Sequence, residues 1–148
     1  MVLDRLWAKL QPLLDVGEVI GRLLFTFIFI SSAPKHLGGE TVQMVADKGL
    51  PLAEVAVPFG GLLAGLGSIL IILGWQTRLG ALMICGFLLP VTLMMHNWWA
   101  FPADQQGSQY ISFIKNFALF GAALFIAARG AGPLSLDARA AAKEEPLG

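Results

Sequence analysis

The sequence predicts an all-α fold, an integral membrane four-helix bundle preceded by a short N-terminal interfacial helix. Hydrophobic residues make up 56% of the 148 residues and charged residues only 14%, and the mean hydropathy is +0.70. These values lie on the apolar side of the range of soluble domains. The chain also contains four apolar runs of about twenty residues, the length that crosses a hydrocarbon core about 30 Å thick. Only short loops remain, which excludes a separate soluble catalytic domain.

We expect a single membrane domain over residues 16–128, with spans at about 16–33, 55–75, 79–95 and 110–128. The first span carries Glu18 and Arg22, four residues apart with the acid first, which favours a structural ion pair on a helix. The second span is uncharged and rich in Gly, Ala and Ser, which predicts close helix packing. The turn at 76–78 is very short, so the second and third spans should be antiparallel neighbours.

The segments that flank the spans give weaker patterns. Residues 1–15 place Leu and Trp side chains at helical spacing, which favours an amphipathic segment in the membrane interface; the alternative is a plain extension of the first span. The first loop should hold a short helix at Glu40–Lys48, ended by a glycine and a proline. Residues 100–109 are expected to form a polar loop. The tail, 129–148, should leave the last span at its glycines and form a short helix at Leu136–Lys143.

Charge distribution predicts the orientation. The net charge is zero, which gives no electrostatic footprint for nucleic acid. Most Lys and Arg residues near the span ends fall on one side, which should therefore face the cytoplasm. We expect a multi-pass protein surrounded by lipid, with both termini cytoplasmic. The cations on that side are Arg5, Lys9, Arg78, Arg129, Arg139 and Lys143.

Lys115 is the most informative single residue, because a lysine inside a span costs on the order of 2.5–3.5 kcal/mol at the membrane centre. Threading the spans up and down brings several polar residues to the same outer half of the bundle. We therefore predict a polar pocket there, with Lys115 close to Glu54, His96 or water. The alternatives are that the Lys115 side chain extends outward to the membrane interface or forms a purely structural pair with Glu54. The candidate pocket residues are Lys35, Glu54, His96, Asn97, Ser112, Lys115 and Asn116.

The sequence shows no motif of stand-alone catalysis, so whether the protein is an enzyme stays open. Two histidines on separate segments, without a third close ligand, do not predict a metal site. No nucleophile–base pair or phosphate-binding loop is evident. The single cysteine, Cys85, lies in an apolar run and cannot form an intramolecular disulfide.

Several stretches, in order and spacing, resemble the DoxX family of small four-helix bacterial membrane proteins. The resemblance runs from about Val19 to Asp137. The stretches that carry it are Gly21-Arg22-Leu23-Leu24 with Phe29 and Ser31-Ser32 leading to Lys35, Gly49-Leu50-Pro51, Leu73-Gly74-Trp75-Gln76-Thr77-Arg78, His96-Asn97-Trp98-Trp99, Phe113-Ile114-Lys115-Asn116 and Gly132-Pro133-Leu134-Ser135-Leu136-Asp137.

The resemblance implies a protein of the bacterial cytoplasmic (inner) membrane that is associated with redox chemistry. Named members are small subunits of quinone-linked oxidoreductase or terminal-oxidase assemblies, and others accompany sulfur-transfer or superoxide-handling proteins. The chain departs from the family pattern at Ala64, where many relatives carry a glutamate in the second span. Because residue 64 is alanine here, it can neither transfer a proton nor pair with Lys115. Glu54 is the nearest acid that could substitute.

The sequence is compatible with three functions. The first is a non-catalytic membrane partner or subunit that docks other membrane or soluble redox proteins; the protein could also associate with copies of itself. The second is an oxidoreductase subunit that binds a quinone or a small anion in the outer-half pocket, with Lys115 donating the main hydrogen bond and His96 carrying a proton. No intrinsic cofactor is evident, and a quinone is the class that this pocket would suit. The third is a permease for a small solute or protons, although the sequence shows no repeat symmetry or paired broken helices.

Overall fold

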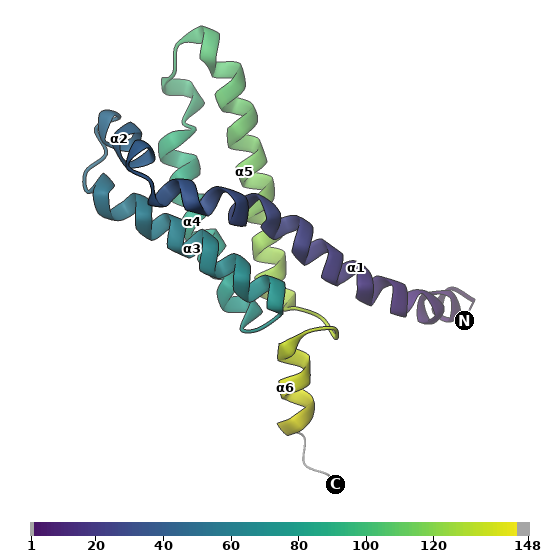
Figure 1. Ribbon diagram of the computed structural model, residues 1–148. Helices are drawn as coiled ribbons and strands as arrows, with labels where there is room; N and C mark the ends of the chain where they lie inside the picture. The colour runs from purple at the N-terminus through teal and green to yellow at the C-terminus, as the bar shows by residue number, and fades with distance from the viewer. Residues whose placement is uncertain (1, 145–148) are drawn as a thin grey trace.

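The computed structural model describes residues 2–144, in which all regular secondary structure is helical, with no strand (Figure 1). The all-α prediction is therefore confirmed. The α-helices are α1 (Val2–Ser32), α2 (Gly39–Asp47), α3 (Ala53–Leu73), α4 (Thr77–Met95), α5 (Ala103–Arg129) and α6 (Leu136–Glu144), and short 3₁₀ helices cover Ala33–Leu37 and Trp98–Ala100.

Three helical segments of the described chain are long and apolar enough to cross a membrane: α3, the segment Thr77–Ala100 that contains α4, and α5. Helix α1 is also long, but its apolar half carries Glu18 and Arg22, with Asp15 just before them. The fourth crossing and the cytoplasmic placement of both termini therefore stay predictions.

The four long helices share one hydrophobic core. Helix α3 packs against α1 on one side and α4 on the other, and α4 packs against α5. The core combines Phe29 of α1, Ala64 and Ile71 of α3, Ile84 and Leu88 of α4 and Ala123 of α5. The N-terminal half of α1 extends away from the other helices (Figure 1), and its apolar side chains, such as Trp7 and Leu13, are exposed.

Helices α3 and α4 approach closely through two glycines, as the small-residue pattern predicts. A Cβ added at Gly67 would lie 2.8 Å from the carbonyl oxygen of Gly80, and one added at Gly80 would lie 2.7 Å from that of Gly67. The turn between the helices is as short as expected. Gly74 ends α3 in the left-handed conformation, and the Gly74 and Trp75 amides donate to the carbonyls of Ile71 and Leu70, which is the Schellman pattern.

Two boundaries differ from the sequence-based expectation. Residues 2–15 continue directly into the first predicted span as one helix, and the Gln11 side chain donates to Asp15 across the expected junction, at 2.7 Å. The interfacial placement of residues 1–15 stays a prediction. The expected loop at 100–109 is mostly the first part of α5. Pro102 has extended backbone before this helix, and Asp104 lies in its first turn, where a negative charge stabilises a helix.

Other short elements agree with the sequence analysis. Helix α2 occupies the first loop within one residue of the predicted Glu40–Lys48 and is followed by Gly49 at positive φ. Helix α6 begins at Leu136, as expected. After α4, the Trp98 ring contacts both Trp99 and Tyr110 edge-on.

Candidate functional site

The C-terminal segment folds back onto the ends of the long helices. After α5 the chain turns at Gly130 and Gly132, both at positive φ, and returns to the turn between α3 and α4. The contacts that hold it come from three distant parts of the sequence. We call this set the tail-docking site; it consists of Arg22, Gly74, Gln76, Thr77, Leu134 and Asp137.

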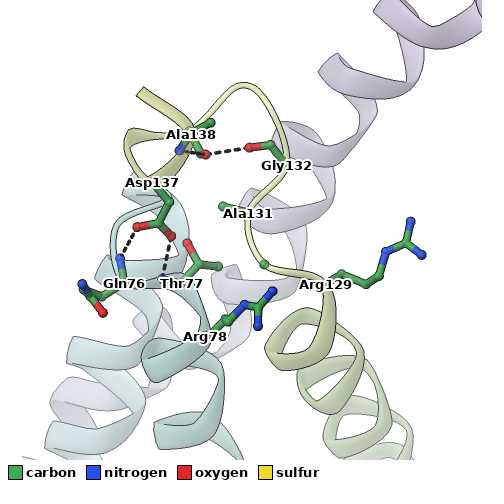
Figure 2. Close-up of a pocket in the computed structure, with 10 residues that line it drawn as sticks. Gln76, Thr77, Arg78, Arg129, Ala131, Gly132, Asp137 and Ala138 are labelled. Carbon is green, nitrogen blue, oxygen red and sulfur yellow. Dashed lines mark hydrogen bonds between the residues drawn. The ribbon is translucent and has the colours of Figure 1, made fainter. Parts of the chain in front are cut away.

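Asp137 binds the start of α4 (Figure 2). Its carboxylate accepts hydrogen bonds from the backbone N–H groups of Gln76, at 2.7 Å, and Thr77, at 3.0 Å. Its own backbone N–H donates to the carbonyl oxygen of Gly74, at 2.8 Å. The first N–H groups of a helix have no partner within the helix and carry a partial positive charge, so a carboxylate from the tail satisfies them well.

Arg22 supplies the second connection. This side chain of α1 is only 6% exposed, and its Nη2 donates to the backbone carbonyl of Leu134, at 2.7 Å. Its Nε and Nη1 atoms are buried without a hydrogen-bond partner among the described residues. The negative charges of Glu18 and Asp137 both act on it. A buried guanidinium of this kind is costly without opposite charges nearby, so Arg22 depends on the tail being in place.

Two glycines make these contacts sterically feasible. Gly74 has φ +64, and a Cβ there would overlap both the Arg22 guanidinium and the Ser135 side chain. Gly132 has φ +77, and a Cβ there would overlap the carboxylate of Glu18. Glycine is the residue that adopts positive φ at no steric cost, so each position serves both the turn and the close contact.

The environment of Asp137 keeps its carboxylate ionised. Burial alone would raise the pKa of Asp137, but the backbone hydrogen bonds from Thr77 and Gln76 and the charge of Arg22 outweigh burial and lower this pKa below its usual range. The tail is therefore docked through a negative charge at neutral pH.

A cavity of about 360 Å³ lies beside the tail-docking site. We call it the arginine cavity; its lining includes Thr77, Arg78, Arg129, Gly132 and Asp137. Arg78 extends from the first turn of α4 toward the end of α5, whereas the Arg129 side chain points outward (Figure 2). The Arg129 guanidinium lies 5.7 Å from the centre of the Phe125 ring.

The predicted outer-half pocket is not assembled by direct contacts. Lys115 is exposed on α5, and no hydrogen bond or ion pair joins it to Glu54 or His96, although the structure describes all three. Glu54 is exposed in the first turn of α3. The Nδ1 atom of His96 lies 2.9 Å from the side-chain oxygen of Gln109, so its partner is the start of α5. The expected short-range pairing of Lys115 is therefore not found.

The other predicted pocket residues are only loosely gathered. Lys35 is exposed at the end of the α1 segment, while Asn97 and Asn116 are partly buried. The Ser112 hydroxyl donates to the carbonyl of Ser108 within its own helix, at 3.1 Å. The expected partner of Arg22 also differs in detail: Glu18 acts on Arg22 through its charge, but the hydrogen bond of Arg22 goes to Leu134.

The fold and the tail-docking site define a helical membrane protein whose C-terminal segment is bound back onto its first helix and its central turn. The DoxX family model matches residues 17–97, and the SURF4 family model matches residues 60–142. The chain belongs to the DoxX family. The matched range of the first model contains Arg22 and Gly74, and that of the second contains Gly74 and Asp137.

Two of the proteins to which this chain is similar are named as inner membrane proteins, which is consistent with a membrane location for the chain. The chain is 34% identical over 123 residues to the inner membrane protein YphA of Escherichia coli K12, which covers 82% of this chain and 88% of YphA. It is 30% identical over 130 residues to the inner membrane protein YqjF of the same organism, covering 86% and 95%. It is 24% identical over 122 residues to the Surfeit locus protein 4 homolog of Drosophila melanogaster, covering 81% of this chain and 39% of that protein. No solved structure matches the chain significantly.

Proposed function

We propose that this protein is a non-catalytic membrane subunit that holds a redox protein at the cytoplasmic face through its docked C-terminal segment. The observation that carries the proposal is the fixed position of α6. Asp137 and Leu134 attach the base of this helix to the membrane domain, while α6 itself has no buried residue and projects beyond the ends of the long helices (Figure 1). A short helix that is attached at its base but otherwise uncovered is suited to a partner.

The redox association of the proposal is supported by the resemblance to the DoxX family, and the cytoplasmic placement by the distribution of Lys and Arg. The absence of a recognisable catalytic motif favours a docking role over an independent activity. A preorganised docking helix also lowers the ordering cost that a free tail would pay on binding.

The test is purification in mild detergent from native membranes with two variants. The first ends the chain after Ala138, which keeps Asp137 and removes most of α6; the matched control is Asp104→Asn, a change of one acid at the start of another helix. We expect the full chain and the control to bring down a protein with flavin or haem absorbance, and the shortened chain to lose it. A full chain that purifies alone as one homogeneous species contradicts the proposal.

One observation favours a second function, a quinone- or anion-binding subunit that uses the outer half of the helices. Lys115 carries a charge within α5 and has no hydrogen-bond or ion-pair partner among the described residues. A ligand carbonyl or anion bound to it would reduce the free-energy cost of a charge inside a membrane span. The test is quinone binding to purified Lys115→Ala and His96→Ala variants. Unchanged binding in both variants excludes this function.

A further inference from the structure

The arginine cavity lies where two membrane-crossing helices end. Thr77 is the first residue of α4 and Arg129 is the last residue of α5, and both helices belong to segments long and apolar enough to span a membrane. The cavity between them is therefore at the level where the hydrocarbon core gives way to headgroups. Trp75, in the adjoining turn, is 54% exposed, as is typical of tryptophans at this level.

The cations of this cavity are uncommitted. Arg78 is exposed and makes no hydrogen bond or ion pair with any residue that the structure describes. Arg129 makes a contact only with the Phe125 ring, and an exposed contact of this kind is weak. The one carboxylate of the cavity, Asp137, is already bound by the Gln76 and Thr77 amides and faces Arg22. It therefore leaves the two arginines free for an anion.

We propose that the arginine cavity binds the phosphate group of an anionic phospholipid. The planar fork of the Arg78 guanidinium, which extends from α4 toward the end of α5, provides the principal paired hydrogen bonds to phosphate oxygens. Arg129 turns from Phe125 to supply the second charge. Basic pockets between membrane helices on the cytoplasmic side are the sites where acidic headgroups bind, and about 360 Å³ is within the range of small-molecule pockets.

The lipid assignment rests on position, since a free phosphate would present the same oxygens. The site lies at the boundary of two spans, so a lipid phosphate is held at the right depth by its own acyl chains, and a soluble anion gains no such advantage. The inference stands apart from the proposed docking function, because Arg78 and Arg129 belong to α4 and α5 and not to α6.

The experiment titrates the purified full-length protein with phosphatidylglycerol, with phosphatidylcholine and with inorganic phosphate, and follows binding by native mass spectrometry and by the melting temperature. The variants are Arg78→Gln and Arg129→Gln. The matched control is Arg139→Gln, which removes an exposed cation of α6 that lines a different cavity. Arg78→Lys keeps the positive charge but lacks the planar guanidinium. It replaces Arg78→Gln in the comparison if Arg78→Gln destabilises the protein, which a lower melting temperature in the absence of lipid would show.

We expect wild-type protein to prefer phosphatidylglycerol, each Gln variant to weaken its binding about fivefold, and Arg139→Gln to leave it unchanged. Arg78→Lys should retain part of the affinity. Equal binding of phosphatidylcholine, or an equal loss in Arg139→Gln, would overturn the site. Protection by inorganic phosphate as strong as that by phosphatidylglycerol would overturn the lipid assignment and leave a site for a soluble anion.

Discussion

Replacing Asp137 by alanine should release the tail while leaving the long helices folded. The change removes the two hydrogen bonds to the Gln76 and Thr77 amides and one charge that stabilises Arg22. Loss of a single capping residue costs about 1 kcal/mol, and hydrogen bonds to charged groups cost more. We therefore expect local opening of the tail to become easier by about 2 kcal/mol, which is about 30-fold in the opening equilibrium.

The measurement is hydrogen exchange of peptides that cover residues 74–78 and 130–139. These peptides should exchange about 30-fold faster in Asp137→Ala, while the core of α4, around Ile84, keeps its protection. Asp137→Asn retains one acceptor oxygen and should give an intermediate effect. Asp104→Ala removes an equal charge from the first turn of α5 and should leave both peptides unchanged. Unaltered exchange of both peptides in Asp137→Ala would refute the assignment of this residue as the attachment of the tail.

Three further predictions concern the same turn and the spans. Gly74→Ala, at φ +64 and against Arg22, should lower stability by about 2–3 kcal/mol, measured as a drop in melting temperature and faster proteolysis of the tail. The pKa of Asp137 is lowered in the folded protein, so its contribution to the stability of the docked tail is present above its unfolded pKa of about 4 and is lost as the pH falls through the folded pKa. Hydrogen exchange of the tail should therefore become faster below about pH 4. Asp137→Asn should lack this acid response. Lys115→Leu should leave the melting temperature unchanged or raise it, and a clear decrease would show that Lys115 has a stabilising partner.

Local sequence patterns were sufficient for most of the helical architecture. The glycine-rich face of the second span predicted close packing, and the structure places Gly67 against Gly80. The short turn between α3 and α4, at residues 74–76, and the short helix at 39–47 also follow from local residue types. The start of α5 was missed because Asp104 and the glutamines before Tyr110 are polar, and polarity marks a loop only when helix breakers accompany it.

The tail-docking site could not be predicted from local patterns, although its parts were visible. The stretches around Arg22, Gly74 and Asp137 each carry the family resemblance, and the charge distribution placed Arg78 and Arg139, near Gly74 and Asp137 in the sequence, on one side of the membrane. Local patterns do not identify the partners of these residues: a buried arginine requires a hydrogen-bond acceptor, and the first N–H groups of a helix favour an anion. Both partners come from a distant tail. The outer-half pocket was inferred from depth alone, and shared depth does not determine which faces of the helices meet.

The hydrogen bond from Arg22 to Leu134 joins residues 112 positions apart, and this has a consequence for biosynthesis. The chain is made from its N-terminus, so Arg22 enters the membrane domain long before its carbonyl acceptor exists. Until Leu134 is synthesised, α1 carries a guanidinium that lacks this bond. Docking of the segment around Leu134 is therefore the step that satisfies Arg22, and a chain that ends before residue 134 retains a buried guanidinium without this acceptor.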